Sequence, residues 1–264
     1  MSDVKLWRYF DLLKFFAFLD GKIYFVRADK FKDKYEGAIP KTCFESFVEQ
    51  SSYGNDEKEK QLVRDAYLKK FDERKKKAAI SCWHINEKES APMWDMYTNA
   101  GQGIAICTSM DKLKSIPKPN EYELEGFEVN YIDFDNEFKE EYFYNELLTF
   151  TTKRLEFKHE HEYRMLLFKI NNSAPFKDFK TDFMNPPKDH EIVEGGFVSK
   201  VYDMPEEGVS VKIDPSIIID EIVMSPYMKS YEIKTVQKII ELYNKKNGTE
   251  FKVRESNLYS NLMY

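Results

Sequence analysis

The stretch EFKHEHEYRMLLF, residues 156–168, sets two histidines, three glutamates, a lysine and an arginine directly before an apolar ending. Read as a β-strand, in which alternate side chains share a face, it puts Glu160, Glu162 and Arg164 on one face together with the apolar residues that follow. The charged end of that face belongs at a rim or cleft, and the apolar end belongs in a core. We therefore predict a central strand over residues 160–169, with Glu162 next to Arg164.

A competing interpretation is that a helix expected over residues 136–157 simply continues to Glu162. Glu156 and Glu160, and likewise Lys158 and Glu162, would then be ordinary neighbours four residues apart on an exposed helix surface. The two interpretations differ in what the apolar residues contact. The strand predicts two core layers, one contacted by Tyr163 and Met165 and the other by Leu166 and Phe168.

The composition is that of a globular protein. The 264 residues are 42% hydrophobic and 33% charged, which suits a sizeable core and predicts no long disordered stretch. We expect a single domain over residues 1–264, with most motifs in residues 1–170 and with residues 171–264 packing on the same core. The net charge of −6 gives no indication of non-specific nucleic-acid binding, although a local basic patch would still permit it.

The cysteines indicate a compartment more than a chemistry. Cys43, Cys82 and Cys107 are odd in number and lack C-x-x-C spacing. The N-terminus has no secretory signal, and the apolar run at residues 15–19 is too short to span a bilayer. These features predict a reduced cytoplasmic protein that does not bind membranes.

Strand and helix patterns alternate irregularly along the chain, without the β-α repeat of a doubly wound sheet. They predict an α+β fold with a central mixed, mostly antiparallel split sheet flanked by helices. Asp11 is the expected N-cap of the first helix, and a proline-containing loop is expected over residues 172–190. The other expected helices cover residues 12–19, 56–77, 90–97, 136–157 and a segment with Ile233, Val236, Ile240 and Tyr243 on one face. The other expected strands cover residues 6–10, 22–27, 78–84, 104–108, 128–132, 196–201, 209–213, 218–223 and 250–254.

Several stretches, in this order, resemble a bacterial family known only as domain of unknown function 2971. They are LWRYF (6–10), IYFVRADKFKDKYEG (23–37), SCWHINEKESAPMWDMYTNAGQGIAI (81–106), FKHEHEYRMLLF (157–168), DEIVMSP (220–226) and VRESNL (253–258). Lys32 and Lys34 depart from the asparagine and proline usual in that family. The resemblance implies a cluster of site residues, namely Arg8, Asp33, Glu36, Trp94, Tyr97, Glu160, Glu162 and Arg164.

Some of these residues also have a structural interpretation. Trp94 and Tyr97 lie three residues apart on one helix face, as core residues often do. Asp33 and Glu36 suit a turn or a cap. If the cluster is a site, Arg8, Glu162 and Tyr97 should line one pocket together with Asp33 or Glu36.

The order of elements also looks like that of the ADP-ribosyltransferase superfamily, whose Glu-x-Glu motif is similar to Glu160-His161-Glu162. That resemblance implies an NAD-cleaving enzyme or effector with NAD as its substrate and no metal. Its catalytic residues would be Glu162, Glu160 and Arg164, because a carboxylate stabilises the oxocarbenium ion formed when nicotinamide leaves. Arg8, Ser81, Tyr97 and Trp94 would bind NAD. If the core separates Arg8 from the two glutamates, the transferase function fails.

Two alternatives remain. A metal-dependent nuclease would hold magnesium on Asp33, Glu36, Glu160 and Glu162, whereas His159-x-His161 lacks a third metal ligand. A non-enzymatic regulatory or partner-binding module would use the ion cluster only to stabilise its fold. The NAD-cleaving enzyme, the nuclease and the non-enzymatic module would all suit a context of phage defence or toxin action. The sequence does not specify the macromolecule or small molecule that the protein would act on. For a catalytic Glu162, we expect Glu162→Gln to leave the melting temperature unchanged.

Overall fold

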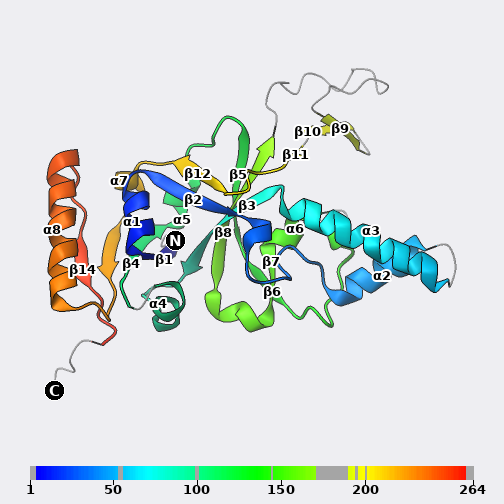
Figure 1. Cartoon of the computed structure of the whole chain (residues 1–264), viewed down its shortest axis with the longest axis horizontal. Helices are drawn as coiled ribbons and strands as arrows, with labels where there is room; N and C mark the ends of the chain where they lie inside the picture. The colour runs from blue at the N-terminus through cyan, green and yellow to red at the C-terminus, as the bar shows by residue number, and fades with distance from the viewer. Residues whose placement is uncertain are drawn as a thin grey trace.

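The computed structural model contains a ten-stranded sheet and two small two-stranded sheets, with helices packed around them (Figure 1). The structure describes residues 4–52, 56–98, 101–143, 145–170, 190–193, 196–199 and 201–259. Within these residues, β13 and β14 form the one parallel pair of the large sheet, so the predicted α+β class and mostly antiparallel sheet are confirmed. The large sheet contains β1 (Lys5–Asp11), β2 (Lys22–Arg27), β3 (Ala78–Ile85), β4 (Gly103–Ser109), β5 (Tyr122–Glu128), β8 (Glu162–Ile170), β11 (Val201–Tyr202), β12 (Val209–Lys212), β13 (Glu221–Met224) and β14 (Val253–Glu255).

Strand β8 contains most of the opening stretch and lies inside the sheet, paired with β3 along one edge and with β5 along the other. The strand interpretation is therefore confirmed, although the strand begins at Glu162 and not at Glu160. Its two faces contact different hydrophobic clusters, as predicted. Tyr163 and Met165 belong to the larger cluster, and Leu166 and Phe168 belong to a smaller one beneath the opposite face.

The sheet is split at strand β3. On one edge of β3, β1 pairs with His84 and Ile85 near its end, whereas β2 pairs with Ala79 and Ile80 near its start. Between β1 and β2 runs helix α1 (Leu12–Leu19), which begins at the predicted N-cap, where the Asp11 carboxylate accepts a hydrogen bond from the Lys14 amide at 2.9 Å. This short crossover explains why the two strands share one edge of β3.

The helix predicted over residues 136–157 is wrong. That region instead contains the 3₁₀ turn η2 (Glu140–Phe143), α6 (Glu146–Thr151), β7 (Thr152–Arg154) and the 3₁₀ turn η3 (Leu155–Glu160). Asn145 starts α6 as its N-cap, and the β-branched pair Thr151-Thr152 ends it by entering β7. Strand β7 pairs with β6 (Asn130–Ile132), outside the large sheet.

Two helices form an arm beside the sheet, at the right of Figure 1. They are α2 (Lys41–Ser51), which the sequence analysis did not predict, and α3 (Glu57–Lys75). Helix α4 (Ala91–Tyr97) packs against β1, and its Met93 and Trp94 are buried. The short turn η1 (Ala28–Lys30) precedes the arm, and α5 (Met110–Lys114) follows β4.

The C-terminal part contributes strands to the same large sheet, and α8 (Ser230–Asn247) and β14 lie at its far end (Figure 1). Helix α8 buries Val236 and Ile240 on the predicted face, and α7 (Pro215–Ile218) precedes β13. Strands β9 (His190–Val193) and β10 (Gly196–Ser199) form a separate pair. The predicted loop at 172–190 lies almost wholly outside the described residues. Among the described helices, none has the length and apolar character needed to cross a bilayer.

Candidate functional site

Arg164 is the centre of a buried ion cluster, which we define as Glu36, Lys153, Glu160, Glu162 and Arg164. Its side chain has no solvent exposure. The guanidinium donates two hydrogen bonds to the Glu36 carboxylate, at 2.6 and 2.9 Å, one to Glu162 at 2.6 Å and one to the Phe150 carbonyl at 2.7 Å. The bidentate contact with Glu36 matches the planar fork of arginine.

Glu162 is held from two sides. One carboxylate oxygen accepts from Arg164, and the other accepts from the Lys153 ammonium at 2.7 Å. Its backbone amide donates to the Tyr131 hydroxyl at 2.9 Å. Burial alone would raise the pKa of Glu162, but Arg164, Glu160 and Lys153 together lower it well below the usual range. Glu162 is therefore a buried carboxylate that stays ionised, and both of its oxygens accept hydrogen bonds from protein cations.

Glu160 is the one member of the cluster whose charge is poised to change near neutral pH. It shares Lys153 with Glu162, at 2.7 Å, and forms a side-chain hydrogen bond with Glu162. Burial, followed by that hydrogen bond and the charge of Glu162, raises the pKa of Glu160 to about 7. With Glu160 protonated, three carboxyl groups and two cations carry a net charge of zero. Glu160 and Glu162 thus form a dyad that holds one proton below about pH 7.

The raised pKa of Glu160 predicts a pH dependence of stability. A glutamate in the unfolded chain titrates near 4.3, so stability contributed by the extra proton is fully present below that pH and is lost as the pH rises through about 7. Glu162 has a lowered pKa, so the stability that it contributes is present above about pH 4.3 and is lost only as the pH falls below that value. We expect the melting temperature of the wild type to fall between about pH 5 and pH 8 more than that of Glu160→Gln. Equal slopes in the two proteins would contradict a shared proton.

Aromatic and titratable side chains surround the dyad on the same face of the sheet. His84 pairs with Glu162 across the strands, and its Nδ1 lies 2.6 Å from the Glu160 carbonyl oxygen. Burial lowers the pKa of His84. Tyr97 is 44% exposed, yet burial and then the charge of Glu160 raise the pKa of its hydroxyl. Tyr97 therefore lies within electrostatic reach of the cluster.

Arg8 and Ser81 do not join this group. Trp7 pairs with His84, and His84 pairs with Glu162, so these three residues share one face. Arg8 is the next residue after Trp7 and lies on the opposite face, where it donates to the Ser81 hydroxyl at 2.5 Å. The prediction that Arg8, Glu162 and Tyr97 line one pocket is therefore wrong, because the sheet itself separates Arg8 from the glutamates.

The remaining candidates divide between the core and a second ion pair. Trp94 is fully buried and packs edge-on against Tyr9 at a centroid distance of 4.9 Å, so it has the core role. Asp33 accepts from Arg154 at 3.1 Å and from the Tyr35 amide at 3.0 Å, as a turn residue does. Of the two acidic residues in this loop, Glu36 alone enters the cluster.

The four carboxylates proposed for magnesium each contact a protein cation: Asp33 contacts Arg154, Glu36 contacts Arg164, and Glu160 and Glu162 contact Lys153. Over the residues that the structure describes, no group of three or more metal-ligating side chains is assembled. This arrangement gives the nuclease hypothesis no specific support.

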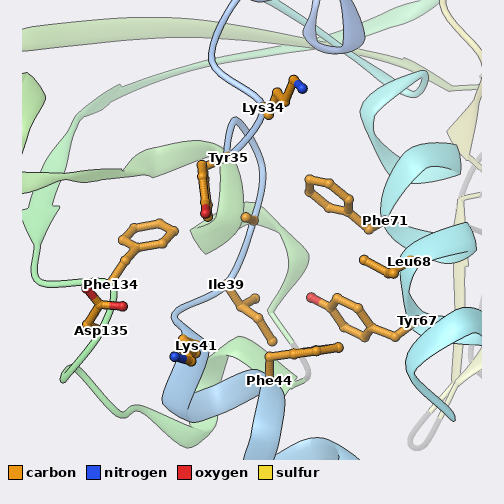
Figure 2. A pocket seen from close by; sticks show the side chains of 11 residues that line it. Lys34, Tyr35, Ile39, Lys41, Phe44, Tyr67, Leu68, Phe71, Phe134 and Asp135 are labelled. Carbon is orange, nitrogen blue, oxygen red and sulfur yellow. The ribbon is translucent and has the colours of Figure 1, made fainter. Parts of the chain in front are cut away.

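A cavity of about 320 Å³ lies on the other side of the loop that contains Glu36, between that loop and the helical arm (Figure 2). Five of its eleven lining residues are aromatic, and their rings gather around one space, as Figure 2 shows. We call this cavity the aromatic pocket, and its five rings are Tyr35, Phe44, Tyr67, Phe71 and Phe134. Small-molecule sites in proteins typically begin at about 300 Å³.

The ion cluster and the aromatic pocket share one loop. Lys34 and Tyr35 line the pocket, Glu36 turns inward to Arg164, and Ala38 and Ile39 line the pocket again. Between them Gly37 has a φ of +76°, and a Cβ there would lie 3.1 Å from the Phe150 ring. The Glu36–Arg164 pair therefore fixes the position of the pocket wall.

The comparison with protein families bears on the middle of the chain. The model of a family described as "Protein of unknown function (DUF2971)" matches residues 93–165. The resemblance stated from the motifs is thereby confirmed over this stretch, which contains Trp94, Tyr97, Glu160 and Glu162. No curated protein and no solved structure matches the chain. The family description gives no activity.

Sequence reasoning missed Lys153, which holds both glutamates, and it missed the aromatic pocket. Lys153 lay inside the helix that was predicted wrongly, where it would have been an ordinary surface lysine. The pocket rings come from four separate segments, and a single aromatic residue on a helix is most often a core residue. One signal was present: a lysine directly after a run of apolar and threonine residues suggests a partly buried cation.

Proposed function

We propose that this chain is a non-enzymatic binding module that takes up a small molecule in the aromatic pocket. The observation that carries the proposal is the shared loop, in which the Glu36 carboxylate is locked to Arg164 while its sequence neighbours line the cavity. The charged residues of the family motif then act as the frame of the pocket wall.

The state of the ion cluster supports a structural role. Glu162 is 3% exposed, and both of its oxygens are held by cations. A catalytic carboxylate must approach a substrate, whereas these groups contact one another. A buried pair of this kind is costly to disturb, which suits a framework.

Binding in the pocket is tested with N-phenyl-1-naphthylamine, a neutral aromatic probe whose fluorescence rises in apolar surroundings. We expect saturable binding that Phe71→Ala weakens by roughly tenfold, since an aromatic contact is worth about 1 kcal/mol or more. Leu62→Ala is the matched control, because Leu62 lies on the same helix, is 69% exposed and does not line the cavity. Equal affinity in both variants would place the probe elsewhere and overturn the proposal.

A second candidate is the NAD-cleaving function, favoured by one observation, the buried pair of Glu160 and Glu162, whose carboxyl groups share the Lys153 ammonium. A carboxyl group with a pKa of about 7 suits acid–base work at neutral pH. Glu160, and not Glu162, would then be the reacting carboxylate, with Tyr97 beside it. Arg8 and Ser81 lie on the far face of the sheet and could not bind the same NAD molecule, so this candidate stands without the Arg8 site on which the transferase resemblance depended.

The two candidates are separated by incubating the protein with NAD and measuring released nicotinamide. The binding-module proposal predicts release at the rate of buffer alone. Nicotinamide release that disappears in Glu160→Gln but persists in the exposed-site control Glu156→Gln would support the transferase or glycohydrolase instead. The melting temperature of both variants confirms that they are folded.

The cellular setting also belongs to the proposal. Cys43, Cys82 and Cys107 are free thiols, which is compatible with a reducing compartment such as the cytoplasm. Burial raises the pKa of Cys82, so that thiol is poorly reactive. A role in phage defence or toxin action would then depend on the signal that the bound small molecule conveys.

A further inference from the structure

We infer that the aromatic pocket selects an organic anion, a molecule with a flat apolar body and one acidic group. This inference rests on the proposed binding function and adds the chemical class of the ligand. Two features carry it: the arrangement of the rings, and the sign of the charge around them.

The rings define the apolar part of the ligand. Tyr35 and Phe134 meet edge-on, with centroids 6.4 Å apart, on one side of the cavity. Phe44 and Tyr67 pack at 5.0 Å on another side, and Phe71 completes the wall. Together with Ile39 and Leu68 they present faces and edges suited to a planar ring system (Figure 2).

A ring of aromatic side chains can also be a cage for a cation, so the charge must decide. Here protein cations already contact three of the rings. The Arg154 guanidinium lies 4.4 Å from the Tyr35 centroid, the Lys75 ammonium lies 4.2 Å from Phe71, and the Arg74 guanidinium lies 6.0 Å from Tyr67. Each of these three rings already has a protein cation close to it, so a cationic ligand would find fewer open ring faces to contact.

Lys34 and Lys41 lie at opposite ends of the cavity (Figure 2), and each offers a cation to an acidic group at its end. Both line the cavity and are exposed, and in the described part of the chain neither makes a salt bridge. Asp135 is the single acidic residue in the lining, so the lining carries a net charge of +1. Lys41 is also the first residue of α2, whose N-cap, Pro40, makes no side-chain hydrogen bond and whose first turn has no acidic residue. At that end of the cavity the helix dipole adds to the attraction of Lys41 for an anion, although the Lys41 amide itself donates to the Phe134 carbonyl.

The experiment compares two probes with the same body. 1-Anilinonaphthalene-8-sulfonate carries a sulfonate, and N-phenyl-1-naphthylamine is its uncharged counterpart. In Lys34→Gln/Lys41→Gln we expect the sulfonate probe to bind roughly tenfold more weakly while the neutral probe binds as before, since each lost ion pair of this exposed kind is worth up to about 1 kcal/mol. Lys69→Gln/Lys70→Gln removes the same charge from an exposed part of α3 and should leave both probes unchanged.

The outcomes distinguish this inference from the proposed function. If neither probe responds to Phe71→Ala, the pocket is not the binding site and the proposed function fails. If both probes respond to Phe71→Ala, the pocket is the binding site. If the sulfonate probe then loses no more affinity in Lys34→Gln/Lys41→Gln than the neutral probe does, or no more than it loses in Lys69→Gln/Lys70→Gln, the preference of the pocket for anions is overturned. Far-UV circular dichroism and the melting temperature of each variant exclude probe binding to partly unfolded protein.

Discussion

Glu162→Gln should lower the melting temperature by roughly 10 °C, because the change leaves two buried cations without their shared counter-ion, at a cost of about 3–5 kcal/mol. The glutamine amide would also direct N–H donors at Arg164 or Lys153, which are donors themselves. This outcome reverses the expectation drawn from the sequence, under which the melting temperature held. The measurement is thermal unfolding followed by circular dichroism at pH 6.

Glu160→Gln is the matched control at the same pH. Glu160 already carries a proton there, since its pKa is about 7, so an uncharged amide replaces an uncharged acid. Its melting temperature should change by only a few degrees, on the order of 1 kcal/mol of stability. If the two variants unfold alike, Glu162 does not carry the charge assigned to it, and the ion cluster does not act as a framework.

Arg164→Lys should be nearly as damaging although it preserves the charge. A lysine ammonium is a single point, and it cannot replace the two hydrogen bonds to Glu36 while also reaching Glu162 and the Phe150 carbonyl. At least one buried carboxylate then loses its partner, which costs about 3 kcal/mol or more. We also expect weaker binding of the neutral probe, because Glu36 no longer holds the wall of the aromatic pocket.

Arg254→Lys provides the comparison for that substitution. Arg254 also makes two hydrogen bonds to one carboxylate, at 2.9 and 3.0 Å to Glu221, and a third to Glu89 at 3.1 Å. Its side chain is 32% exposed, so solvent can replace what is lost, and we expect a cost within about 1 kcal/mol. Comparable losses in Arg164→Lys and Arg254→Lys would show that burial does not amplify the effect.

The ion cluster connects parts of the chain that are distant in sequence. Glu36 comes from the loop before α2, Lys153 from β7, and Glu162 and Arg164 from β8. Substitutions in the ion cluster should therefore weaken probe binding in the aromatic pocket, even though no cluster residue lines it. Loss of stability and loss of probe binding should appear together in cluster variants and separately in variants of the pocket itself.

The local features of the site were predictable because they depend on short-range periodicity. A period of two places Glu162 and Arg164 on one strand face, and the switch to apolar residues on that face places one end of it in a core. The Asp11 cap and the helix after it follow from a local hydrogen bond. The predicted helix over residues 136–157 failed because pairing of β7 with β6, a tertiary contact, outweighs helix propensity there.

The sequence by itself determined the strand that contains Glu162 and Arg164, their adjacency, and the mostly antiparallel α+β class, since each follows from periodicity within a segment. Only the tertiary structure decided that Arg8 lies on the other face, that Lys153 joins the glutamates, and that four segments close an aromatic pocket. The physical reason is that both faces of this sheet are buried. Apolar patterning then no longer tells which face of one strand matches which face of the next, and a shift of one residue in register reverses the answer.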